Sequence, residues 1–262
     1  MIPEITLIVA ATTRHMGIGK GGTLPWTGLK QEMAYFARVT KRVPNTEVCS
    51  TPLLENRSAH KLALKHNSTP QNCYNTIVYQ AQTTKQNRSQ TNLFTQGLKP
   101  LRNAVIMGRR TWDSIPSRFR PLKDRANIVL SRSFTRPLSL ALIDTQKEAI
   151  KVASAGEALS CLEPSTEFDP HELPVDIHRV FVIGGSDVYR TFLSNANTKR
   201  ILLTRVLSDF DCDTYFPVVL GNVGEWRKRS KEELDAWVGE EVPEGEQEEN
   251  GVRYVFEMYE RD

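Results

Sequence analysis

Residues 179–193 read RVFVIGGSDVYRTFL, and this stretch decides the fold class. The apolar run Arg179–Ile183 predicts a buried strand, two adjacent glycines end it, and Asp187–Leu193 has the pattern of a helix. Adjacent glycines at the carboxyl end of a strand let a ligand approach the backbone, and the N-terminus of a following helix favours phosphate. The stretch therefore predicts an α/β sheet with a ligand at its carboxyl edge.

The same alternation of strands and helices extends through most of the chain. A helix begins near Leu29, and Ser154 with Glu157 forms a capping box at the start of another. Further strands are predicted at Ile5–Ala11, Asn103–Met107, Asn127–Ser131, Val180–Ile183 and Ile201–Val206, with an alternating antiparallel strand over residues 252–258. We therefore expect one α/β domain over residues 1–262, with a central, mixed, mostly parallel sheet, an antiparallel C-terminal strand and flanking helices.

Composition excludes several classes of protein. The chain has 262 residues, 39% hydrophobic and 25% charged, which is typical of a globular protein, and no apolar run approaches the length of a membrane span. The first residues, Met-Ile-Pro-Glu, carry no basic leader, so we expect a cytoplasmic protein. The four cysteines and five histidines show no metal-binding spacing, and we expect no metal site.

Residues 43–98 differ from the rest of the chain. Ser, Thr, Asn and Gln make up 25 of these 56 residues, and the apolar residues follow no period, so we expect a polar, disordered insertion. A genuine loop and a translated intron both remain open as explanations. Lys41–Lys99 has a charge balance of +6, whereas residues 231–262 have −9, so nucleic-acid binding through a general basic surface is not expected.

The sequence Gly17-Ile18-Gly19-Lys20-Gly21-Gly22 matches the glycine pattern of a dinucleotide-binding fold. That fold requires a helix directly after the glycines, but Pro25 disfavours helix at Leu24 and the helix begins only near Leu29. We therefore reject this interpretation and expect a glycine-rich, mobile loop, with a simple flexible connector as the alternative.

Glu32 falls on the apolar face of its predicted helix, which also carries Leu29, Met33, Phe36 and Ala37. A carboxylate in that position needs strong partners or a raised pKa, although an exposed first-turn acid is an equal alternative. Arg109, Arg110 and Arg132 follow two other predicted strands. Arginines gathered at one sheet edge suit a ligand with several phosphates, although any one of them alone is more simply read as solvated.

These residues occur in an ordered series that resembles the dihydrofolate reductase family in its eukaryotic, fungal form. The series runs through Ile8-Val9-Ala10, Met16–Lys20, Leu24-Pro25-Trp26, Glu32, Ile106–Trp112, Ser114-Ile115-Pro116, Arg120-Pro121-Leu122, Val182–Ser186, Thr204-Arg205, Asp209-Phe210, Asp213-Thr214 and Phe216-Pro217. The resemblance implies that hydride from NADPH reduces dihydrofolate to tetrahydrofolate, which supports one-carbon metabolism and the synthesis of thymidylate, purines and glycine. It further implies a monomer that needs no membrane, metal or obligate protein partner.

The resemblance also assigns roles to residues. Glu32 would orient the substrate and favour its protonation, Thr204 would support that carboxylate, and a water near Trp26 and Leu24 would carry the proton. The substrate-binding residues would be Ile8, Val9, Glu32, Met33, Phe36, Ile115, Leu122, Arg125 and Thr204, with Arg125 holding the substrate's α-carboxylate. The cofactor-binding residues would be Ala10, Gly17, Ile18, Gly19, Lys20, Gly22, Thr23, Arg109, Arg110, Thr111, Ser131, Arg132, Ile183, Gly184, Gly185, Ser186, Asp187, Val188 and Tyr189.

Two rival functions remain open at this level. One is a related nicotinamide reductase that acts on a pyrimidine of flavin biosynthesis, against which Leu24-Pro25-Trp26 and Glu32 argue. The other is a nucleic-acid-binding protein that works through residues 43–98. Phe119 stands where the family has an asparagine beside the substrate's tail, so inhibitor selectivity is not carried over.

Overall fold

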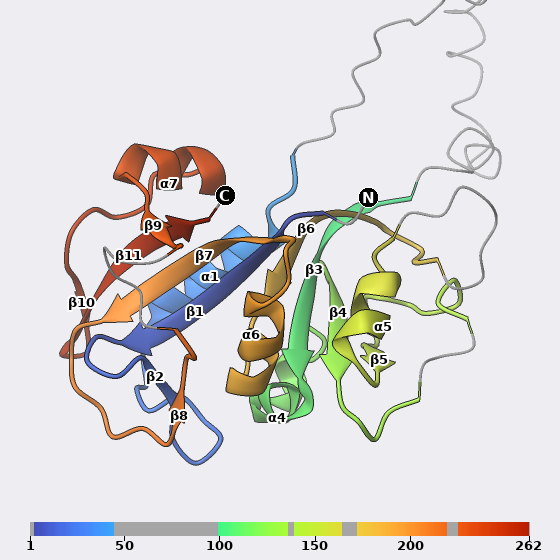
Figure 1. Ribbon diagram of the computed structural model, residues 1–262, viewed down its shortest axis with the longest axis horizontal. Helices are drawn as coiled ribbons and strands as arrows, with labels where there is room; N and C mark the ends of the chain where they lie inside the picture. Colours follow the sequence, from blue (N-terminus) through green and yellow to red (C-terminus); the bar gives the residue numbers. More distant parts are fainter. Residues whose placement is uncertain (1–2, 45–98, 136–138, 164–171, 219–224, 262) are drawn as a thin grey trace, which may run out of the picture. The chain divides into compact units, whose positions relative to one another are not determined.

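The structure is a computed structural model that describes residues 3–44, 99–135, 139–163, 172–218 and 225–261 (Figure 1). The chain divides into two units, residues 1–43 with 99–262, and residues 44–98. Of the second unit only Pro44 is described, so the predicted disordered insertion lies almost wholly outside the described residues.

A nine-stranded mixed sheet forms the centre of the first unit, counted over the described residues. Its order is β10 (Gln247–Glu249), β11 (Val252–Glu260), β7 (Thr198–Val206), β1 (Ile5–Thr12), β6 (Asp176–Val182), β3 (Leu101–Gly108), β4 (Arg125–Leu130) and β5 (Ile150–Val152), and β9 (Arg227–Lys228) pairs with β11. Strands β7 to β5 pair in parallel, whereas β11 runs antiparallel to β7. The predicted fold class is confirmed, and the predicted strands are found with shifted ends.

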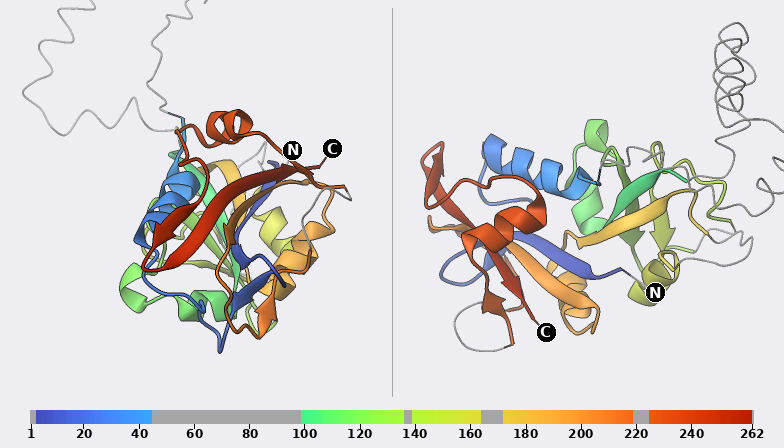
Figure 2. Two further views of the ribbon diagram at one scale, coloured as in Figure 1. Left: turned by 90° about the vertical axis from the view of Figure 1, so that its left-hand side faces the viewer. Right: turned by 90° about the horizontal axis from the view of Figure 1, so that it is seen from above.

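Helices cover both faces of this sheet. Helices α1 (Lys30–Lys41) and α7 (Lys231–Val238) pack on one face, and α5 (Ala155–Ser160) and α6 (Ser186–Leu193) pack on the other. Figure 2 shows α1 in blue and α6 in orange on opposite sides of the sheet. A short helix, α4 (Arg109–Ser114), and a 3-10 turn (Ser117–Phe119) follow β3, and β2 (Gly17–Gly19) pairs with β8 (Thr214–Tyr215) in a separate small sheet.

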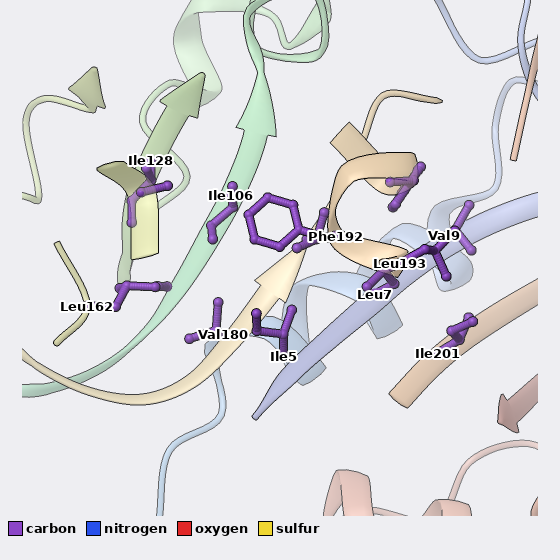
Figure 3. Packing of buried hydrophobic residues seen from close by; sticks show 14 of the residues in the cluster. Ile5, Leu7, Val9, Ile106, Ile128, Leu162, Val180, Phe192, Leu193 and Ile201 are labelled. Carbon is purple, nitrogen blue, oxygen red and sulfur yellow. The ribbon is translucent and has the colours of Figure 1, made fainter. Parts of the chain in front are cut away.

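The period of two along β1 divides the core into two layers. Leu7 and Val9 point towards α6, where they join Phe192 in the larger cluster (Figure 3). Ile8 points to the other face and packs with Tyr35 of α1. Each fully buried side chain of this size contributes roughly 1.5–3 kcal/mol, so the Ile8 layer holds α1 against one face of the sheet and the Leu7 layer holds α6 against the other.

Helix α1 begins at Lys30, with Leu29 as its N-cap, so the predicted start is confirmed. The predicted apolar face is partly wrong. The buried residues of the helix are Glu32, Tyr35, Val39 and Thr40, whereas Phe36 and Ala37 are half-buried and Met33 is 49% exposed. Tyr35 and Val39 turn towards the sheet, which leaves Met33 on a flank that the sheet does not cover.

The N-terminal cap of α5 differs from the prediction, and α7 has a cap that was not predicted. Ser154 accepts a hydrogen bond from the Glu157 N–H, but the Glu157 carboxylate accepts from the Ala153 N–H, so only half of the predicted capping box forms. A complete box, Ser230 with Glu233, starts α7. No helix in the described ranges is long and apolar enough to cross a membrane.

Candidate active site

Glu32 is a buried carboxylic acid at the start of α1. Its side chain is 6% exposed, and Oε1 accepts a hydrogen bond of 3.0 Å from the Thr204 hydroxyl of β7. Burial raises the pKa of Glu32 to about 7, the Thr204 hydrogen bond partly offsets this, and the negative charge of Glu249 adds to it. Oε2 makes no hydrogen bond with any described residue. The carboxyl can therefore hold or release a proton near neutral pH and has one oxygen available to a ligand.

Trp26 lies beside the N-terminal end of α1 and supplies an unpaired donor. Its ring is buried, packs with Leu29 and Tyr254, and meets Phe210 edge-on at 5.5 Å. The indole Nε1 is buried without a hydrogen-bond partner in the described part of the chain. Buried N–H groups are normally paired, so this donor suits a water or a ligand atom. Leu24, also predicted to be catalytic, is 46% exposed.

Four of the predicted substrate-binding residues meet on the α1 face of the sheet. Phe36, Ile115 and Leu122 are half-buried and pack against the cluster that contains Ile8. Together they form an apolar surface suited to a flat ring. Val9 points to the opposite face, because it belongs to the larger hydrophobic cluster that contains Phe192 (the α6 cluster). Only its backbone can therefore reach this surface.

Arg125 begins β4 and is a buried cation. Its Nη1 donates to Thr40 Oγ1 at 2.8 Å and its Nε donates to the Lys123 carbonyl at 3.0 Å. Burial lowers the pKa of Arg125 to about 10, with Asp124 opposing this change. Among the described residues no carboxylate forms an ion pair with it. A buried guanidinium without an ionic partner suits an anionic ligand group.

The carboxyl ends of β3 and β6 lie side by side, where Gly108 contacts Gly184. The Gly108 N–H donates to the Gly184 carbonyl at 2.8 Å, and the Ile183 N–H donates to the Ile106 carbonyl at 2.9 Å. A Cβ placed on Gly185 would lie 3.5 Å from Thr111 Oγ1, so the hydroxyl of α4 stands beside the backbone that leads into α6. The predicted glycine edge is therefore brought together from two strands.

The polar side chains in the first turn of α6 are already paired with other protein groups. Ser186 donates its hydroxyl to the Tyr215 carbonyl at 2.6 Å, and Asp187 pairs with Arg190 at the surface. Tyr189 is buried and donates to the Ile8 carbonyl at 2.7 Å, which ties α6 to the middle of β1. Val188 is half-buried against the α6 cluster. The hydroxyls of Ser186 and Tyr189 thus already have protein partners.

Arginines at the strand ends are exposed. Arg109, Arg110 and Arg132 form no ion pair with another described residue. Ser131 is half-buried and its hydroxyl shares a hydrogen bond of 2.9 Å with Ser133. Lys151 of β5 lies opposite Val129 of β4, and its Nζ is 5.6 Å from the centroid of the Phe134 ring.

The predicted glycine-rich loop is paired to a second segment. Gly17 and Gly19 form β2 and pair with Tyr215 and Thr214, and the Gly21 N–H donates to Asp213 at 2.7 Å. Lys20 forms an ion pair with Asp211. A Cβ on Gly17 would lie 2.4 Å from Cys212 Sγ, so only glycine fits there. Ala10 and Ile18 are half-buried, Gly22 is exposed, and the Thr23 hydroxyl donates to the Lys20 carbonyl.

Sequence reasoning missed two residues that support the site. Thr40 holds Arg125 from the last turn of α1, and Glu249 accepts from backbone N–H groups in its first turn. Neither contact has a local signal, because each joins residues that are far apart in the chain. No group of three His, Cys, Asp or Glu in the described ranges could hold a metal ion.

Comparison with known proteins finds the family that the sequence resembles. The family model described as dihydrofolate reductase matches residues 96–261. The chain is 31% identical over 262 residues to the dihydrofolate reductase of Pneumocystis carinii, which covers 99% of this chain and 97% of the relative. Identity to the dihydrofolate reductase of Cryptococcus neoformans is 33% over 281 residues, covering 98% and 94%. For that of Mus musculus it is 30% over 261 residues, covering 100% and 99%.

Proposed function

The chain belongs to the dihydrofolate reductase family, which reduces dihydrofolate to tetrahydrofolate with a nicotinamide cofactor, and we propose that Glu32 is the acid that orients and protonates the substrate. The reaction supplies tetrahydrofolate for one-carbon metabolism. The observation that carries the assignment of Glu32 is its burial, with Thr204 on one oxygen and the other oxygen unpaired. A planar pair of N–H donors on a pterin ring suits a carboxylate held in this way.

The raised pKa of Glu32 explains how one residue can serve both roles. At a pKa of about 7 the carboxyl exchanges a proton near neutral pH, which is where a general acid is most effective. We assign the unpaired Trp26 N–H to a water that passes the proton to the substrate's ring nitrogen. Leu24, exposed at the surface, would limit access of further water to this path.

The apolar surface and Arg125 account for the rest of the substrate. Ile8, Phe36, Ile115 and Leu122 would contact the pterin and benzoyl rings, with Met33 at the exposed edge. Arg125 would bind the α-carboxylate of the glutamate tail, because a buried cation without an ion pair favours an anion strongly. Thr40 would hold the guanidinium in the required direction.

The nicotinamide cofactor is proposed to be NADPH, which supplies the hydride. The residues fit such a group, because three arginines without ion pairs lie at the carboxyl edge where Thr111 stands beside the glycine backbone. Arg109, Arg110, Ser131 and Arg132 would bind the ribose phosphate that distinguishes NADPH from NADH. Gly184, Gly185, Ser186, Asp187 and Thr111 would contact the pyrophosphate, while Ala10, Ile18 and Gly22 would border the nicotinamide. The loop Met16–Thr23 would act as a lid by separating from residues 211–216.

Consumption of NADPH in the presence of dihydrofolate, followed by absorbance, tests the proposal. We expect Glu32→Gln to lose nearly all turnover while binding NADPH within a few-fold of the parent chain. Glu248→Gln, which removes an exposed carboxylate elsewhere, is the matched control and should leave turnover unchanged. Normal turnover by Glu32→Gln would show that the assigned role is wrong.

The same assay addresses residues 43–98. Activity both in the 262-residue chain and in a chain that lacks Val43–Leu98 would show that the insertion is not needed for catalysis. Activity only in the shortened chain would support a translated intron or an obstructing segment. We also propose a cytoplasmic enzyme without an obligate protein partner, which cell fractionation and sedimentation of the purified protein would test.

A further inference from the structure

The first turn of α1 carries Glu32 but has no cap of its own. Leu29 occupies the N-cap position, with φ −77° and ψ 75°, and offers no side-chain acceptor. The first N–H groups of a helix have no partner within it and must be paired by side chains, water or ligands. A helix whose first turn holds an active-site acid therefore depends on a partner from elsewhere in the fold.

Glu249, the last residue of β10, supplies this partner. Its carboxylate accepts from the Gln31 N–H at 3.0 Å to Oε1 and 2.9 Å to Oε2, and from the Glu32 N–H at 3.4 Å to Oε2. These N–H groups are the donors that an N-cap side chain would normally pair. A carboxylate at a helix N-terminus is also favoured by the helix dipole. A residue more than 200 positions away thus performs the function of the missing cap.

The hairpin of β10 and β11 is itself locked to the start of α1. Asn250 Nδ2 donates to the Gly28 carbonyl at 2.6 Å, and the Tyr254 hydroxyl donates to Glu249 Oε2 at 3.1 Å. Gly28 has φ +81°, and a Cβ there would lie 2.4 Å from Asn250 Nδ2, so this approach requires glycine. Phe256 of β11 packs against Tyr35 of α1 with 4.2 Å between ring centroids. Glu249 is therefore held at a fixed place relative to Glu32.

The charge of Glu249 acts on the same carboxyl. The titratable groups that interact with Glu32 in the described structure are Glu249 from β10 and the tyrosines Tyr35, Tyr189 and Tyr254. Burial raises the pKa of all three tyrosines, so they stay neutral over the working range. Glu249 is then the charged neighbour of Glu32, and its negative charge favours the protonated carboxyl.

We propose that Glu249 is a positioning residue for Glu32, because its carboxylate caps the first turn of α1 from the β10–β11 hairpin. The inference rests on the proposed role of Glu32. It has two consequences that can be separated. Loss of the cap loosens the helix turn and misplaces Glu32, and loss of the charge makes the Glu32 proton easier to remove.

The test measures kcat/KM for dihydrofolate against pH in Glu249→Gln and Glu249→Ala. Because kcat/KM reports the free enzyme and the protonated acid is the productive form, the fall in activity at high pH should move to lower pH in both variants. Glu249→Ala should also lose about tenfold in kcat, since a misplacement of under 1 Å is costly, while Glu249→Gln retains one acceptor and loses less. The KM for NADPH should stay within twofold.

Three controls accompany this test: the variant Glu248→Gln, circular dichroism and the variant Glu32→Gln. Glu248→Gln removes the same charge one residue away and should match the parent profile. Circular dichroism at each pH shows that the variants are folded. A Glu249→Gln profile that coincides with the parent, while Glu32→Gln is inactive, would overturn the positioning role. Full activity in Glu32→Gln would instead overturn the proposed function on which it rests.

Discussion

The buried acid of the site should make the free protein less stable at high pH, and Glu32→Gln measures by how much. Burial raises the pKa of Glu32 from 4.5 to about 7. Between these values the folded state keeps a proton that the unfolded chain releases, so the free energy of unfolding falls as the pH rises. At about 1.4 kcal/mol per pKa unit, the penalty reaches about 3 kcal/mol above pH 7 and vanishes below pH 4.5.

Glutamine keeps the acceptor for Thr204 but cannot ionise. We therefore expect Glu32→Gln and the parent to have nearly equal free energies of unfolding at pH 4.5, and the variant to be more stable by about 3 kcal/mol at pH 8.5. Urea unfolding at several pH values measures this difference, with the slope against urea unchanged between the two proteins. Other groups that titrate over the same range are common to both proteins and cancel.

Glu257 provides a control of opposite sign. Burial alone would raise the pKa of this second buried glutamate, but Lys228 and Arg205 hold it below its ordinary value. Glu257→Gln should therefore be less stable than the parent at pH 8.5, where the lost charge leaves two cations unpaired. If Glu32→Gln differed from the parent by the same amount at every pH, or were the less stable protein at pH 8.5, the reasoning from desolvation would be refuted.

Three further predictions concern the proposed ligand contacts. Arg125→Leu should raise the KM for dihydrofolate by about 10- to 100-fold, the value of a hydrogen bond to a charged group, with the KM for NADPH unchanged in steady-state assays. Arg132→Gln should lower kcat/KM for NADPH by about tenfold but leave that for NADH unchanged, and equal losses for both would contradict the assignment. Gly17→Ala should separate β2 from β8 and lower kcat, because its Cβ would meet Cys212 Sγ at 2.4 Å. Adding Cys212→Gly should restore much of the loss, and a double variant as slow as Gly17→Ala would show that this contact is not the cause.

Much of the fold could be predicted because its signals are local. Buried parallel strands are continuous apolar runs, so Ile5–Ala11 and the run before Gly184 could be recognised without knowledge of their neighbours. Pro25 disfavours a helix directly after the first glycines, and the spacing of the apolar residues from Leu29 predicts the start of α1 correctly. The capping box Ser230–Glu233 is also a local signal, because a Ser followed three residues later by a Glu is typical of a helix start.

Other features depend on packing that no local pattern encodes. Helical periodicity predicts that Met33 is buried with Phe36, but it does not show how far the sheet extends beneath the helix, and Met33 is half exposed. The helical pattern is equally compatible with an exposed and a buried Glu32. Its contact with Thr204 of β7, a distant strand, shows that it is buried. That Leu29 offers no cap could be read from the sequence. That Glu249 replaces it could not.

Helix α1 also sets the distance between the two polar ends of the proposed substrate site. Glu32 lies in its first turn, capped by Glu249, and Thr40 near its end accepts from Arg125 and donates to the Phe36 carbonyl. Eight residues at 1.5 Å each separate them by about 12 Å along the axis. Asn103 donates to the Thr40 and Arg42 carbonyls, which fixes the far end of the helix just before residues 43–98 begin. Both anchors are therefore held by residues outside that segment, and this is the physical reason to expect catalysis from the chain that lacks it.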